Sequence, residues 1–267
     1  MIDMHSHILP GLDDGAADWE QAIAMARHAL ADGITEMVCT PHWVLGKYDN
    51  ARETILARFA EFETRLAAER IPLTIHPGAE LRIDVSLPER LRAGELLTLN
   101  NGSGYLLLEL PEEMLPDNLH DFFWGLQIQG FRLILSHVER NPVLREDPQR
   151  LFDWVENGIL AQITAASLSE GFSAEIAEFA RFLLEHRLAQ MLVTDTHSLS
   201  MRKPQLSEAC RAVDELLGPG AATRMVCDTP RCILRGEPLP AVVPLPLEGP
   251  RQRKRSALWS FLRKGTA

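Results

Sequence analysis

Short apolar runs and amphipathic stretches alternate about seven times along this chain of 267 residues. The apolar runs predict strands at Ile2–Met4, Ile34–Cys39, Leu73–His76 running on toward Glu80, Tyr105–Leu110, Arg132–Leu135, Ile159–Ile163 and Met191–Val193. Between them, apolar residues recur every three or four positions, which predicts helices near Asp18–Ala31, Ala51–Glu69, Pro116–Gln129, Pro148–Glu156, Ala174–His186 and Pro204–Leu217. Strands and helices in this order form parallel sheets with right-handed crossovers. We therefore expect a single α/β domain built as a closed barrel, a distorted (β/α)7 arrangement with one unit fewer than the usual eight.

The composition changes after residue 236, where the predicted barrel (residues 1–236) ends. The next segment, 237–250, is rich in proline, which cannot continue a helix or pair in a central strand, and we expect an extended linker. Residues 251–267 form a tail with six basic residues and no acidic one. This basic tail is expected either to be solvated or to make a weak contact with an anionic membrane or a membrane-bound partner.

The first 250 residues are more acidic than the total net charge of −10 suggests, because the tail is basic. An acidic surface does not favour nucleic acid, whose phosphates require clustered Lys and Arg. The start of the chain, MIDMHSHILPG, lacks the basic residues and long apolar run of a secretory signal. No apolar run reaches the 18 residues of a membrane span, and the four cysteines form no CxxC pair. These features predict a cytoplasmic protein with reduced thiols and no nucleic-acid partner.

Histidine and carboxylate side chains gather where the predicted strands end. The set comprises His5, His7, Asp14, His42, Glu80, Glu109, His137, Asp195 and His197. In a barrel the strand ends meet on one rim, where the catalytic residues of such folds lie. Eight or nine nitrogen and oxygen ligands are too many for one ion and suit two or three, with positions left for water and substrate. Mn²⁺, Fe²⁺ and Zn²⁺ all accept such ligands. The pattern indicates a metal-dependent hydrolase.

Two points about this set stay open at the level of sequence. Asp13 and Asp14 are adjacent in GLDDG; we favour Asp14 as the ligand and expect the other to cap the following helix. A single histidine after a strand is more often structural than a ligand, so a binding protein with purely structural metals is the non-enzymatic alternative. Five of nine histidines at strand ends argue against that alternative. The other four histidines (His28, His76, His120 and His186) are expected to be structural.

The motifs MIDMHSHILPGLDDG, CTPHW, PGAEL, SHVER and DTH, in this order, resemble the PHP superfamily. More narrowly, residues 1 to about 235 resemble the manganese-dependent protein tyrosine phosphatases of the CpsB/CapC/YwqE type from bacterial capsule and exopolysaccharide loci. The resemblance implies a PHP-type barrel with up to three metal ions, Mn²⁺ above all. It implies one ion on His5, His7 and Asp195, with Glu80 bridging to a second on Glu109 and His137, and a third on Asp14, His42 and His197.

The resemblance also implies a reaction and a substrate. Arg140 of SHVER and Arg202 after DTH would bind the phosphate, with Lys203 competing for the second role. The substrate would be phosphotyrosine on a membrane-associated kinase that controls capsule or exopolysaccharide synthesis. The alternative is a small-molecule phosphatase of the histidinol-phosphatase type. A cysteine-based tyrosine phosphatase is excluded, because no cysteine has an arginine six residues later. The general acid stays open.

Overall fold

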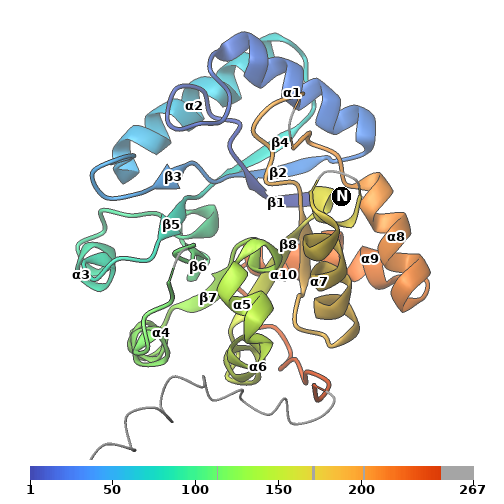
Figure 1. The fold of residues 1–267 in the computed structure, drawn as a ribbon. Coiled ribbons are helices and arrows are strands. Elements are labelled where there is room, and N and C mark those ends of the chain that lie inside the picture. The colour runs from blue at the N-terminus through green and yellow to red at the C-terminus, as the bar shows by residue number, and fades with distance from the viewer. Residues whose placement is uncertain (113, 170–171, 201, 248–267) are drawn as a thin grey trace, which may run out of the picture.

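The structure is a computed structural model that describes residues 1–112, 114–169, 172–200 and 202–247 (Figure 1). Its strands are β1 (Ile2–Ser6), β2 (Glu36–Cys39), β3 (His42–Trp43), β4 (Thr74–Pro77), β5 (Glu80–Arg82), β6 (Tyr105–Glu109), β7 (Arg132–Leu135), β8 (Leu160–Thr164) and β9 (Met191–Val193). Every pairing between these strands is parallel. The seven predicted strands are therefore confirmed, and the predicted tail 251–267 lies outside the described residues.

The strands close into a distorted ring. Two of its members are broken: Thr40 and Pro41 separate β2 from β3, and Gly78 and Ala79 separate β4 from β5, so each pair forms one interrupted strand. The ladder runs β1-β2-β4 on one side of the breaks and β3-β5-β6-β7-β8-β9 on the other. The ring closes where the His7 N–H donates to the Thr196 carbonyl (2.9 Å) and the Asp195 N–H to the His5 carbonyl (3.0 Å). The expected seven-unit barrel is confirmed.

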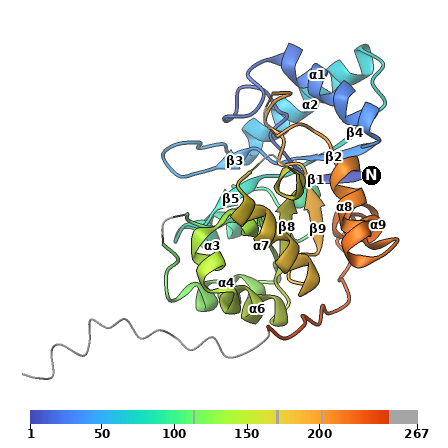
Figure 2. The same cartoon turned by 45° about the vertical axis from the view of Figure 1, so that its right-hand side comes forward.

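Helices surround this ring (Figures 1 and 2). They are α1 (Trp19–Asp32), α2 (Arg52–Ala68), α3 (Leu87–Arg92), α4 (Leu119–Ile128), α5 (Pro142–Glu146), α6 (Pro148–Glu156), α7 (Ala174–Glu185), α8 (Ser207–Leu217), α9 (Ala221–Thr223) and α10 (Thr229–Leu234). Short 3₁₀ turns lie at Leu99–Asn101, Val138–Arg140 and Ala165–Leu168, and a π-helical turn at Arg224–Asp228. The six predicted helices are present, whereas α3, α5 and the helical stretch from α9 to α10 were not predicted.

Alternation along the strands divides the core into two layers. In β6, Leu106 and Leu108 pack with the surrounding helices, while Tyr105 and Leu107 belong to a separate cluster inside the ring. The inner cluster contains Ile2, Met4, Val38, Leu99, Tyr105, Leu107, Ile134, Leu160, Met191 and Val193, with Ile233 and Leu234 of α10. Since many of these residues stand near the strand starts, α10 covers that end of the barrel. The opposite end, where the strands finish, carries the site.

The proline-rich segment that follows α10 has neither helix nor strand up to residue 247. It nevertheless contacts the barrel: Leu239 and Val242 pack against the core, and the Leu245 N–H donates to the His186 carbonyl (3.0 Å). Within the described residues, no helix is both long and apolar enough to cross a membrane.

Candidate metal centre

Four ligand atoms from three separate places in the chain meet at the end of the barrel. His5 and His7 approach each other through Nε2 (3.1 Å), and Asp195 Oδ1 lies 3.3 Å from both nitrogens. Glu80 Oε2 completes the group at 3.4 Å from His5 and 3.6 Å from His7. Ligands held about 2.1 Å from one metal ion are themselves about 3.0–3.5 Å apart. The four atoms therefore have the spacing of a metal coordination shell.

Glu80 extends from this group toward a second one. Its Oε1 lies 3.1 Å from His137 Nε2, and its Oε2 lies 2.9 Å from His42 Nδ1. Glu109 faces the same two histidines at longer distances, 3.7 Å from His42 and 3.8 Å from His137. A carboxylate in this central position can face two cations at once, as a bridge between them.

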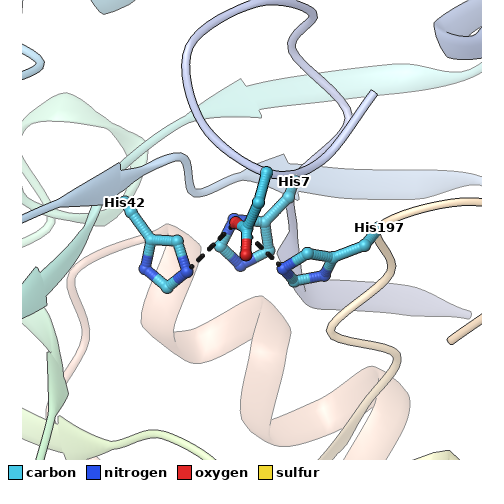
Figure 3. Close-up of side chains that lie close together, drawn as sticks. His7, His42 and His197 are labelled. Carbon is cyan, nitrogen blue, oxygen red and sulfur yellow. Dashed lines mark ion pairs between the residues drawn. The ribbon is translucent and has the colours of Figure 1, made fainter. Parts of the chain in front are cut away.

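A third group lies beside the first (Figure 3). The Oδ1 atom of Asp14 is 3.5 Å from Nε2 of both His42 and His197. The ring of His7 lies close to both imidazoles, with centroids 4.4 Å from His42 and 4.0 Å from His197. All nine predicted ligands are thus brought into three adjoining groups by the described residues.

Asp13 and Asp14 have different surroundings. Asp14 is half-exposed and faces the third group, whereas Asp13 is buried behind His7. Asp13 Oδ2 accepts from His7 Nδ1 (2.7 Å) and from the His42 N–H (2.9 Å), and its Oδ1 accepts from the Gly15 N–H (2.9 Å). Asp18 caps α1 through the Gln21 N–H, so the prediction that Asp13, the other aspartate of GLDDG, caps this helix was wrong. Asp13 instead orients His7, one of the predicted ligands.

The buried polar atoms of the three groups suit a divalent cation. Both oxygens of Glu80, His42 Nδ1 and His197 Nε2 are buried and make no hydrogen bond within the described part of the chain. Burial opposes the charge of Glu80, but His5 and the neighbouring histidines lower its pKa well below the usual range. Burial and the neighbouring His7 lower the pKa of His197 to about 3. An ionised carboxylate and a neutral imidazole are the forms that bind metals.

The two predicted phosphate-binding arginines meet on one carboxylate. Arg140 Nη1 and Arg202 Nη1 lie 2.7 Å and 2.6 Å from Asp195 Oδ2, and both side chains are partly exposed. Glu139 is not the partner of Arg140, because its Oε1 accepts from the Thr164 N–H and the Ser167 hydroxyl. Asp195 therefore has one oxygen toward the histidines and the other toward two guanidinium groups.

Two polar residues of the site escaped the sequence analysis. Gln162 in β8 accepts from His5 Nδ1 through Oε1 (3.1 Å), and Arg82 at the end of β5 binds both oxygens of Glu109. A signal for Arg82 existed, since it stands two residues after Glu80 and so on the same side of an extended strand. Gln162 stood within a predicted strand, but nothing in its spacing pointed to His5.

Comparisons with known proteins agree on one group of relatives. The family described as "Capsular polysaccharide synthesis, CpsB/CapC" matches residues 1–235. Tyrosine-protein phosphatase YwqE of Bacillus subtilis is 33% identical over 261 residues, 98% of this chain and 100% of YwqE. Tyrosine-protein phosphatase CpsB of Streptococcus pneumoniae is 28% identical, over 88% of this chain and 98% of CpsB.

Solved structures extend this comparison. One from the work on YwqE and CpsB, described as unique metal-dependent tyrosine phosphatases, has a TM-score of 0.88 and 33% identity, covering 93% of this chain and all of its own. Histidinol phosphate phosphatase from Lactococcus lactis has a TM-score of 0.53 at 13% identity, over 80% of this chain and 94% of its own. At that identity the likeness concerns the fold alone.

Proposed function

Because this chain belongs to the CpsB/CapC family of capsular polysaccharide synthesis proteins, we propose that it is a metal-dependent tyrosine-protein phosphatase. The observation that carries the proposal is Asp195, which faces three histidines through one oxygen and two arginines through the other. That arrangement sets a phosphate-binding charge directly beside a metal-binding group. Relatives that match over nearly the whole length bear the same activity in their names.

The nine residues are proposed to bind two or three ions in the groups described above, with Mn²⁺ as the natural cation and Fe²⁺ or Zn²⁺ as substitutes. Imidazole and carboxylate ligands suit all three. Such cations, when bound, lower the pKa of water and stabilise charge on phosphate oxygens. Asp13 and Gln162 accept the Nδ1 protons of His7 and His5, which leaves both Nε2 lone pairs for the metal side.

Arg140 and Arg202 are proposed to bind the phosphate of the substrate. A guanidinium carries five N–H donors in a plane and keeps its charge at any working pH. Asp195 contacts Nη1 of each arginine, so other donors of the two forks can face phosphate oxygens above the metal centre. Charge that develops on those oxygens during hydrolysis is stabilised by donors already in place.

The substrate is proposed to be phosphotyrosine on a protein, namely a membrane-associated kinase that controls capsule or exopolysaccharide synthesis, and the site of action to be the cytoplasm. A phenolate leaves more readily than an alkoxide and needs less acid help. We assign the catalytic barrel to residues 1–236, the linker to 237–250, and a weak contact with the membrane or the kinase to the basic tail 251–267.

The test compares two substrates on one metal-free preparation of the full chain. A phosphotyrosine peptide should be hydrolysed after addition of Mn²⁺ and not before, whereas histidinol phosphate should be a poor substrate in both conditions. Efficient turnover of histidinol phosphate with an inert peptide would instead favour a small-molecule phosphatase on the same fold.

A further inference from the structure

A third arginine lies at the metal centre and contacts a different carboxylate from the other two. Arg82, the last residue of β5, donates from Nε to Glu109 Oε2 (2.7 Å) and from Nη2 to Glu109 Oε1 (2.9 Å). Two parallel N–H···O contacts of this kind hold the carboxylate plane as well as its charge. Arg82 and Glu109 are also direct partners in the β5–β6 ladder, so the sheet register places them side by side.

This pair differs from the ion pairs on the protein surface. Glu109 is only 4% exposed, and the side chain of Arg82 is one-third exposed. Burial disfavours the guanidinium charge, but the hydrogen bonds and charge of Glu109 raise the pKa of Arg82 above its ordinary value. The surface pair Arg27–Glu69, in contrast, makes one contact of 2.9 Å with both side chains more than half exposed. Exposed pairs of that kind contribute little to stability.

Three carboxylates of the site differ in whether they contact an arginine. Asp195 is held by Arg140 and Arg202, and Glu109 is held by Arg82. Glu80 lies between them and, within the described residues, forms ion pairs with four histidines and with no arginine. A carboxylate offers about four lone-pair positions, so Glu109 can accept both N–H groups of Arg82 and still face a cation.

We propose that Arg82 is a positioning residue that holds Glu109 in place for the metal ion it shares with Glu80 and His137. The inference rests on the proposed metal-dependent function and adds a residue to it. Without Arg82, a nearly buried carboxylate would lose its two donors and its fixed plane. Outer partners of metal ligands contribute roughly 10- to 100-fold in metal affinity. Loss of Arg82 should therefore weaken one metal site and leave the groups around Asp195 and Asp14 filled.

The experiment titrates Mn²⁺ into metal-free full-length protein and follows binding by calorimetry. Wild type is compared with Arg82→Ala, Arg82→Lys and the matched control Arg27→Ala. We expect Arg82→Ala to need roughly 10- to 100-fold more Mn²⁺ to fill its weakest site. Arg82→Lys keeps the positive charge but cannot donate two parallel hydrogen bonds, so the Mn²⁺ concentration it needs should be intermediate. Arg27→Ala should need the same Mn²⁺ concentration as wild type. At saturating Mn²⁺ the KM of Arg82→Ala for a phosphotyrosine peptide should stay near the wild-type value.

Two results would overturn the proposal. Unchanged Mn²⁺ binding with a raised KM would make Arg82 a substrate-binding residue, and unchanged Mn²⁺ binding with only a lower melting temperature would make it structural. The proposed function can fail separately: wild-type protein that binds Mn²⁺ without hydrolysing the peptide would refute the phosphatase, while the titration would still decide the role of Arg82.

Discussion

Glu80 is the carboxylate at the barrel end that is proposed to bridge two metal ions. It faces four histidines from two adjoining groups, so its charge serves both. Glu80→Gln keeps the shape and removes the charge, and we expect loss of at least one bound ion. Since outer partners of ligands already contribute up to about 100-fold, kcat/KM should fall by about 100-fold or more. Metal analysis and peptide turnover measure both effects.

Glu36→Gln is the matched control for this change. Glu36 also pairs with a histidine, His76, but lies outside the metal centre. A Glu80→Gln protein that keeps full metal content and wild-type turnover would show that Glu80 does not bridge.

Arg140→Ala and Arg202→Ala should each lower kcat/KM for a phosphotyrosine peptide by about 10²-fold, since one preorganised donor to an oxyanion is worth roughly 3 kcal/mol. Because both arginines also contact Asp195, metal content and melting temperature are measured on the same samples. Near-normal values of both would assign the loss to phosphate binding. Arg65→Ala, which removes an exposed pair with Glu61, serves as control. If both variants hydrolyse the peptide at near wild-type efficiency, Arg140 and Arg202 do not form the phosphate-binding site.

The spacing of residue types along the chain predicts some residues of the site and not others. The convergence of the nine candidate ligands could be predicted, because they lie at or after strands whose ends meet on one rim. The residues that hydrogen-bond to these candidate ligands could not be assigned to their partners from the sequence. Asp13 reaches His7 only through the path of the GLDDG loop, and Arg82 reaches Glu109 only through the register of β5 against β6. Neither loop path nor register is encoded in the spacing of residue types along one chain.

The loop between β1 and α1 is packed closely enough at Gly15 to exclude a larger side chain. A Cβ on Gly15 would lie 2.0 Å from the carbonyl oxygen of His7, which accepts from the Ala16 N–H. Gly15→Ala must therefore displace the loop, with His7 and Asp13. We expect a loss of about 1–3 kcal/mol in the free energy of unfolding, as for other overpacked sites, together with lower metal content. Urea unfolding and metal analysis provide the measurements.

Gly125 in α4 offers the opposite case for comparison, because an added Cβ there meets nothing within 4 Å. Gly125→Ala should be neutral or stabilising by up to about 1 kcal/mol, the helix propensity difference. Equal stability and metal content of the two variants would refute the close-contact argument for Gly15.

Long periodic elements were predictable and short ones were not. The predicted strands and six helices all appear, because each presents a clear apolar pattern. The helices α3, α5 and α10 have only five or six residues, too few to show a period. They depend on tertiary contacts instead: Ile233 and Leu234 bury their side chains inside the ring. The short strand β3 was also missed, because the predicted run ends at Cys39, before the break at Pro41. The break at Gly78 was missed because the stretch from Leu73 toward Glu80 was predicted as one strand.

For the molecule as a whole, thiol chemistry should be irrelevant to catalysis. Burial raises the pKa of the Cys39 thiol far above its ordinary value and that of Cys210 to about 11, so neither is a ready nucleophile. Alkylation with iodoacetamide should leave peptide hydrolysis largely intact, with modification followed by mass spectrometry. Complete inactivation of folded protein by modification of one thiol would overturn the metal-based mechanism.

Metal removal should affect the stability of the whole barrel as well as its activity. A ligand that binds only the native state at 100 times its Kd adds about 2.7 kcal/mol to the free energy of unfolding. Chelator treatment should therefore abolish hydrolysis and lower the melting temperature, and Mn²⁺ should restore both. The same chelator saturated with Mn²⁺ is the control. Undiminished activity with less than about one ion per chain would refute the site.

The closure of the ring also sets an order of events during synthesis. The seam joins β1 to the segment after β9, and Thr194, which contacts the His5 carbonyl there, lies 189 positions after it in the chain. At 5–20 residues per second, ribosomal synthesis separates the two by roughly 10–40 s. Throughout that interval His5 and His7 are already made while Asp195 is not. The proposed metal-binding group of His5, His7 and Asp195 can therefore form only after Asp195 has been synthesised and its segment has joined β1.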